Sequence, residues 1–132
     1  MNYAMILVAE EGDKLVGYLS AKGGVFLRAR HKVHVVVEIL QFFTRKGVGT
    51  ALFLELEKWA DRTDAHRLEL TVMAHNDIAL ALYKKMGFVI EGTSKDSRLV
   101  DDRYVDEYYM AKMLSGLRSG WEFSIGEECL GG

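Results

Sequence analysis

Apolar residues in the first part of the chain fall into runs of strand length. Residues 4–9 are all apolar, and residues 15–20 form a second, mainly apolar run after a polar turn at residues 10–14. Two such runs joined by a short turn are typical of a β-hairpin. The sequence Lys-Gly-Gly at residues 22–24 interrupts the second run, and residues 25–30 fit either a strand or a loop.

The strand expected over residues 31–40 has two unlike faces. Because side chains alternate along a strand, one wholly apolar face is predicted to lie in the core, made by Val33, Val35, Val37 and Ile39. The other face carries His34 and Glu38 between Val36 and Leu40. Two ionisable side chains on such an apolar strand indicate either a functional surface or a structural polar network.

Beyond residue 48 the apolar period becomes that of a helix. A first stripe consists of Val48, Leu52, Leu56 and Trp59, and a second of Ile78, Ala79, Leu82, Tyr83 and Met86. Between them, residues 68–73 form a strand, and Asn76 is placed to cap the second helix, which Gly87 ends. Residues 88–91 and 104–113 are predicted as two closing strands joined by a polar loop.

Strands that alternate with helices predict an α/β fold with the order ββ-β-α-β-α-ββ. The hairpins at both ends make the expected sheet mixed, and two main helices flank it. Residues 1–114 are predicted to form one domain. Residues 115–132 are rich in Gly and Ser and have no clear periodicity, so they are predicted to be a C-terminal tail.

Composition narrows the classes of function. With 17 Lys and Arg against 19 Asp and Glu, the 132-residue chain has a net charge of −2, which argues against nucleic acid as a partner. The apolar runs are too short to cross a bilayer, so no membrane association is expected. The single cysteine, Cys129, cannot form an internal disulfide, which favours a cytoplasmic location.

Residues 44–50, Thr-Arg-Lys-Gly-Val-Gly-Thr, carry the strongest chemical signal. Gly47 and Gly49 allow a close approach of the backbone to a ligand, and the free N–H groups of the following helix favour an anion. Arg45 and Lys46 add positive charge, so a pyrophosphate is the expected ligand. The Walker A pattern is absent, and Leu52 stands where a dinucleotide fingerprint needs its third glycine. A turn that merely begins a helix is the alternative.

This loop resembles motif A of the GNAT superfamily of N-acetyltransferases, Gln/Arg-x-x-Gly-x-Gly/Ala, although Thr44 stands at the first position. Downstream, residues 76–88 resemble motif B of the same superfamily through Asn76, Ala79, Tyr83 and the closing Gly-Phe pair. The resemblance extends over about residues 4–114. It implies a splayed sheet with acetyl-CoA in the gap between the strands on either side of the first helix.

The resemblance also implies roles for individual residues. The backbone of Ile39 and Leu40 is expected to bind the pantetheine and acetyl group, and Asn76 to contact the pantetheine arm. The pyrophosphate is expected to lie on Arg45, Lys46, Gly47, Val48, Gly49 and Thr50. Members of the superfamily usually have a strand and one or two helices before the first hairpin, whereas this hairpin begins almost at Met1. The side that receives the acceptor therefore looks cut down.

Amide formation from a thioester needs a neutral amine, a stabilised oxyanion and a proton for the departing thiolate. Tyr83 is the expected acid, unless it is only a core aromatic. The backbone N–H of Leu40 is the expected oxyanion donor. Glu38 is favoured as the base, acting through water, whereas His34 would need a longer water chain. The other histidines do not show metal-ligand spacing with Cys129 or with one another, so no metal is expected.

The favoured hypothesis is an acetyl-CoA-dependent N-acetyltransferase that acts on a primary amine, either a small molecule or a protein N-terminus, by direct attack. The alternative is a non-catalytic CoA-binding or dimeric interaction module derived from such an enzyme. A nucleotide-binding regulator is disfavoured, because both nucleotide motifs are absent. A homodimer is expected, because a sheet without its first strand has an exposed edge.

Overall fold

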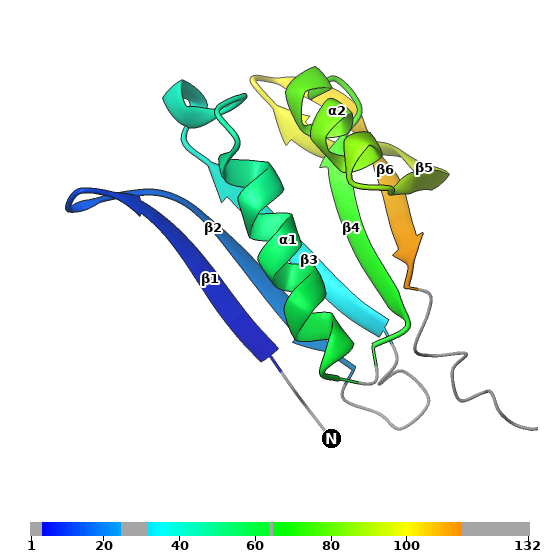
Figure 1. Cartoon of the computed structure of the whole chain (residues 1–132). Helices are drawn as coiled ribbons and strands as arrows, with labels where there is room; N and C mark the ends of the chain where they lie inside the picture. The colour runs from blue at the N-terminus through cyan, green and yellow to red at the C-terminus, as the bar shows by residue number, and fades with distance from the viewer. Residues whose placement is uncertain (1–3, 25–31, 64, 115–132) are drawn as a thin grey trace, which may run out of the picture.

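The computed structural model describes residues 4–24, 32–63 and 65–114, which form one mixed sheet with two helices (Figure 1). The elements are β1 (Ala4–Glu11), β2 (Lys14–Gly23), β3 (Lys32–Ile39), a 3-10 turn η2 (Gln41–Phe43), α1 (Val48–Asp61), β4 (Arg67–Met73), α2 (Asp77–Lys85), β5 (Val89–Val100) and β6 (Arg103–Met113). The predicted α/β class and the order of strands and helices are confirmed. The predicted tail at residues 115–132 and the ambiguous residues 25–30 lie outside the described residues.

The six strands lie in the order β1-β2-β3-β4-β6-β5. β3 and β4 are parallel neighbours, and the other neighbouring pairs are antiparallel. α1 is the crossover that connects these two parallel strands, as expected for a strand-helix-strand unit. The order places the first hairpin at one edge of the sheet and the last hairpin at the other.

β3 and β4 separate soon after they begin. They pair only over residues 32–34 of β3 and 67–69 of β4, although β3 continues to Ile39 and β4 to Met73. The two strands diverge toward their C-terminal ends, and the N-terminus of α1 and the whole of α2 lie at the open end (Figure 1). The expected splayed sheet is therefore confirmed, with its opening at the carboxyl ends of two parallel strands.

Both helices pack on the same side of the sheet, where the core lies (Figure 1). The alternation of β3 is as predicted, since Val33 and Val35 are buried and Val37 and Ile39 pack partly buried against the core. In α1 the buried stripe includes Phe53 as well as the predicted leucines. Its ring meets those of Tyr83 and Phe88 edge-on, at centroid distances of 5.8 and 5.5 Å, which connects α1 to α2 and to the start of β5.

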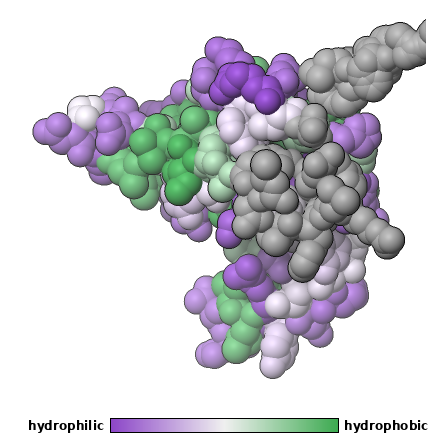
Figure 2. All heavy atoms as spheres, turned by 90° about the horizontal axis from the view of Figure 1, so that it is seen from below, coloured by the Kyte–Doolittle hydropathy of each residue, from purple (hydrophilic) through white to green (hydrophobic). Residues whose placement is uncertain are grey.

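The opposite face of the sheet has no helix over it among the described residues. Apolar side chains of β1 and β3 are exposed there, with relative accessibilities of 70% for Ile6, 57% for Val8 and 41% for Val36. The view from below shows hydrophobic surface between hydrophilic regions (Figure 2). His34 and Glu38 share this face of β3 and are exposed, as their alternation with the buried valines requires.

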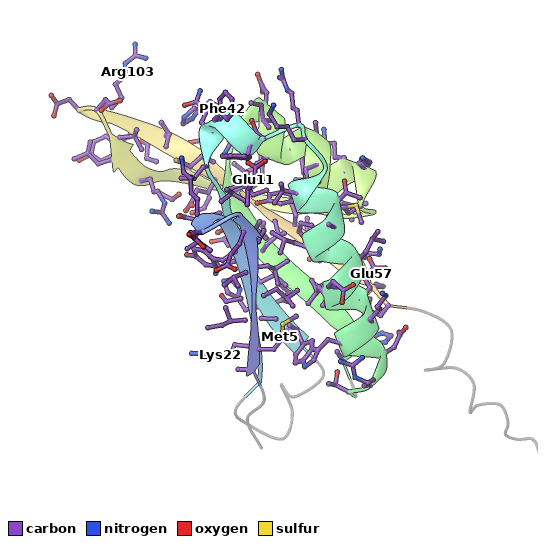
Figure 3. All side chains as sticks on the ribbon, turned by 60° about the vertical axis from the view of Figure 1, so that its left-hand side comes forward. Met5, Glu11, Lys22, Phe42, Glu57 and Arg103 are labelled. Carbon is purple, nitrogen blue, oxygen red and sulfur yellow. The ribbon has the colours of Figure 1, made fainter. Side chains whose placement is uncertain are left out.

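The prediction of a polar loop between the closing strands is wrong. Residues 92–100 continue β5, and β5 and β6 form a long hairpin closed by Asp101 and Asp102, whose φ angles of 50° and 64° are positive. Its tip, marked by Arg103, projects from the rest of the molecule (Figure 3). A strand pair with solvent on both faces needs no apolar alternation, so its sequence is polar and was read as a loop.

None of the helices in the described residues is long and apolar enough to cross a membrane.

Candidate functional site

A pocket of about 630 Å³ opens where β3 and β4 separate. Its walls come from the end of β3, the loop after it, the first turn of α1 and one side of α2. The lining residues are Val37, Glu38, Ile39, Gln41, Thr44, Arg45, Gly47, Gly49, Thr50, Asn76, Asp77, Ile78, Ala79, Ala81, Leu82, Tyr83 and Lys85. Ligands of open α/β sheets bind at such crevices outside the carboxyl ends of strands.

The loop before α1 makes an anion-binding end of this pocket. Arg45 and Gly47 have φ angles of 64° and 87°, so the backbone curls before the helix begins. The first intrahelical hydrogen bond is donated by the N–H of Ala51 to the carbonyl of Gly47, at 3.0 Å. The N–H groups of residues 48–50 therefore have no intrahelical acceptor and are available to a phosphate.

Gly49 lets α1 approach α2 and β3 closely. A Cβ atom on Gly49 would lie 2.5 Å from Cδ2 of Leu82 and 3.2 Å from Cδ1 of Ile39, whereas a Cβ on Gly47 would meet nothing within 4 Å. The two glycines are thus needed for different reasons. Gly47 supplies a left-handed backbone conformation, and Gly49 supplies space between the helices.

The two basic side chains of the loop lie in different places. Arg45 lines the pocket, but Lys46 does not, because its Nζ lies 4.8 Å from the centroid of the Phe42 ring. A cation–π contact holds Lys46 on that aromatic ring, so the structure does not bring its side chain to the pocket as predicted. Lys85, which the sequence reasoning missed, lines the pocket instead, and its Nζ donates to Oγ1 of Thr50 at 3.1 Å.

At the end of β3, the backbone groups that point toward the pocket are not all those that were predicted. The N–H of Leu40 donates to the carbonyl of Val16 at 2.9 Å, and Leu40 is absent from the pocket lining. The prediction that this N–H is a free oxyanion donor is therefore wrong. Since backbone groups alternate in direction along an antiparallel strand, Val37 and Ile39 turn theirs away from β2, toward the split.

Asn76 serves as the predicted cap of α2. Its side-chain oxygen accepts a hydrogen bond from the N–H of Ala79 at 3.2 Å, and Asp77 lies in the first turn of the helix. Asn76 also lines the pocket. Because the oxygen is engaged in the cap, the amide NH₂ group is the part of this side chain left to donate to a ligand.

Tyr83 is a pocket residue held by aromatic packing. The residue is 7% exposed, its ring packs against Phe53 and Phe88, and its hydroxyl has no hydrogen-bond partner among the described residues. Burial raises the pKa of the phenol above its ordinary value, and the negative charge of Glu38 raises it further. The hydroxyl is therefore protonated at neutral pH and, on a residue that lines the pocket, is a candidate proton donor.

Glu38 and His34 line two different pockets. Glu38 lines the pocket, whereas His34 lines a second hollow, of about 420 Å³, with Arg67 and Glu91. Arg67 there donates to the carboxylates of Glu69 and Glu91. The structure thus gives Glu38 access to the candidate reaction site and gives His34 none. In the described part of the chain, no three His, Cys, Asp or Glu residues are grouped to hold a metal ion.

Comparison with known proteins agrees with this geometry. Residues 2–88 match the acetyltransferase (GNAT) family. The chain is 38% identical over 106 residues to L-amino acid N-acetyltransferase AaaT of Escherichia coli (strain K12), covering 78% of this chain and 64% of AaaT. It thus spans less than two thirds of that relative's length.

Solved structures share the fold. An acetyltransferase of the GNAT family from Streptococcus pneumoniae superposes with a TM-score of 0.80 at 30% identity, covering 84% of this chain and 67% of that one. The yncA protein of Salmonella typhimurium, whose structure contains its cofactor acetyl-CoA, superposes with a TM-score of 0.76 at 24% identity, covering 84% and 65%.

Proposed function

Because the chain belongs to the acetyltransferase (GNAT) family, we propose that it transfers the acetyl group of acetyl-CoA to a primary amine. One observation carries the proposal. A single pocket is lined both by a helix N-terminus with free N–H groups and by Tyr83 and Glu38. That arrangement suits a ligand with a pyrophosphate at one end and a reactive thioester at the other.

In the proposed complex, phosphate oxygens accept hydrogen bonds from the N–H groups of residues 48–50, and Arg45 balances their charge. The pantetheine arm lies along the free backbone edge of Val37 and Ile39, and Asn76 donates to it. The thioester lies near Tyr83. This placement keeps the predicted roles of Ile39, Asn76, Arg45 and the loop glycines. It replaces Leu40 by Val37 as a backbone contact of the pantetheine arm and by Ile39 as the oxyanion donor.

The proposed reaction is a direct transfer. Glu38, through a water molecule, accepts a proton from the incoming ammonium group, and the neutral amine attacks the thioester carbonyl. The new C–N bond forms, and the backbone N–H of Ile39 donates to the developing oxyanion. When the C–S bond breaks, Tyr83 donates its proton to the thiolate. The nitrogen, which is positively charged after its attack, loses its second proton to solvent water as the amide forms, and the phenolate of Tyr83 regains a proton from solvent.

The acceptor class follows from the relatives. AaaT is named for N-acetylation of L-amino acids, so L-amino acids head the acceptor panel that we propose. Polyamines, aminoglycosides and peptides with free N-termini complete it.

We also propose a homodimer, because β1 and β5 are edge strands of the described sheet. We propose a cytoplasmic location, because Cys129 lacks an internal partner for a disulfide. Light scattering coupled to gel filtration tests the dimer.

The decisive experiment is calorimetric titration of the chain with acetyl-CoA, CoA and ATP, followed by a thiol-release assay on the acceptor panel. Gly47→Glu places a negative charge in the anion site and is expected to abolish CoA binding. Gly12→Glu is its matched control, because both glycines have positive φ and open space around the Cβ position.

Three results distinguish the candidates. Binding of acetyl-CoA with turnover of an amine supports the proposed reaction. Binding without turnover of any amine supports the non-catalytic CoA-binding module. Tighter binding of ATP than of CoA, or no binding of either CoA species, would overturn both.

A further inference from the structure

We propose that Lys85 is the second cation of the phosphate site, supplied by α2 rather than by the loop before α1. The inference rests on the function proposed above and adds a ligand-binding residue to it. Neither the loop motif nor the cap motif of α2 pointed to this lysine. Its position in the structure does.

Lys85 lies on the side of α2 that faces the pocket. Ile78, Leu82 and Lys85 follow one another at intervals of four and three residues, so they share one helical face, and all three line the pocket. Lys84 is the next residue along the same helix and has the same charge, but it is absent from the lining. The pocket thus distinguishes two neighbouring lysines.

The Nζ of Lys85 is already at the helix N-terminus that binds the anion. It donates to Oγ1 of Thr50 at 3.1 Å, across 35 residues of sequence, and Thr50 belongs to the first turn of α1. The hydroxyl of Thr50 is a neutral acceptor, whereas a phosphate oxygen is a charged one that forms a stronger hydrogen bond with an ammonium group. When a pyrophosphate lies on this turn, Lys85 exchanges the hydroxyl for a phosphate oxygen.

The distribution of charge in the pocket supports the assignment. Its basic lining residues are Arg45 and Lys85, and its acidic ones are Glu38 and Asp77. Lys46 is held over the ring of Phe42. A pyrophosphate diester carries two negative charges, and Arg45 and Lys85 match that number. Because Lys85 comes from a different element than the loop, phosphate binding also ties α2 to α1.

The test measures affinity for CoA, 3′-dephospho-CoA and inorganic pyrophosphate by calorimetry in the wild-type chain and in Lys85→Met, Lys85→Arg and Lys84→Met. Loss of one charge-assisted hydrogen bond is expected to weaken binding of all three ligands by about 10- to 100-fold in Lys85→Met. Lys85→Arg is expected to regain most of the affinity, and Lys84→Met to match the wild type.

Each outcome bears on a different claim. Wild-type binding of CoA with an unchanged Lys85→Met affinity overturns the Lys85 assignment and leaves the proposed function standing. A loss for CoA but not for 3′-dephospho-CoA and pyrophosphate moves Lys85 to the 3′-phosphate and overturns its place on the pyrophosphate. Equal losses in Lys84→Met and Lys85→Met show only a general charge effect and also overturn it. Absence of wild-type binding to all three ligands overturns both proposals.

Discussion

Tyr83 lines the pocket from α2, and Glu38 lines it from β3. Burial raises the pKa of the Tyr83 phenol, and the negative charge of the Glu38 carboxylate raises it further. One of the two groups is a proton donor, and the other is a proton acceptor. The phenol holds a proton at neutral pH, and the exposed carboxylate can accept one. They are thus suited to opposite ends of an acyl transfer.

Removal of the Tyr83 hydroxyl is expected to slow the proposed transfer without disturbing the ring. Tyr83→Phe keeps the packing against Phe53 and Phe88, so the affinity for acetyl-CoA stays the same while kcat falls by about 100-fold or more. Steady-state kinetics and calorimetry check the two quantities separately. Tyr109→Phe, on β6 and half exposed, is the control. Unchanged kcat in Tyr83→Phe would remove the acid role.

The raised pKa of Tyr83 also predicts how stability changes in alkali. The folded protein holds this proton above the pKa of about 10 found in an unfolded chain, so the unfolding free energy falls as pH rises beyond about 10. One such group contributes a slope of at most about 1.4 kcal/mol per pH unit. Tyr83→Phe is expected to show a shallower loss in urea unfolding between pH 10 and 11. Parallel curves for the two proteins would contradict this.

The space that Gly49 leaves between the helices can be tested by a double-mutant cycle. Gly49→Ala places a Cβ against Cδ2 of Leu82 and is expected to destabilise the fold by about 1–3 kcal/mol in denaturant unfolding. The cost is expected to shrink in a Leu82→Ala background, because the overlapping atom is gone. Additive effects in the cycle would show that the side chain of Leu82 does not cause the steric clash.

The contact of Glu91 with Arg67 predicts a loss of stability in acid. Its hydrogen bond from Arg67 lowers the pKa of Glu91 below its ordinary value. Because the folded pKa is depressed, the stabilisation is complete above the unfolded pKa and is lost as pH falls through the folded one. The difference in unfolding free energy between wild type and Glu91→Gln should therefore shrink below about pH 4.3. Glu11→Gln, on an exposed strand end, is the control; a constant difference down to pH 2 would refute the link.

The parts of the fold with one buried face could be predicted from sequence, because burial imposes a period. The alternation at Val33 and Val35 and the stripe around Leu52 and Leu56 gave strands and helices close to the observed ones. The strand residues 92–100 were missed, because a projecting hairpin buries too little to impose such a period. Positive φ at Asp101 and Asp102 marks its turn, and adjacent aspartates are a weaker signal for it than Asn-Gly.

The residues of the candidate site could be predicted where a sequence motif determines the backbone conformation. The positions of long side chains, which can contact more than one partner, were predicted less well. Gly47 and Asn76 have the conformation and the cap that their positions required. Lys46 is held by the ring of Phe42, a contact that depends on how the loop folds back. Lys85 could have been found from its spacing of seven residues after Ile78, once Ile78 was known to face the pocket.

The three-residue junction between β3 and β4 divides the sheet into two plates, β1-β2-β3 and β4-β6-β5 (Figure 1). A change in the angle between the two parts breaks no hydrogen bond inside either of them. A ligand bonded to the free edge of β3 acts as a seventh strand and stiffens the bend. The amide hydrogens of Val37 and Ile39 then exchange with deuterium more slowly in the loaded protein, while those of the β1–β2 hairpin keep their rate.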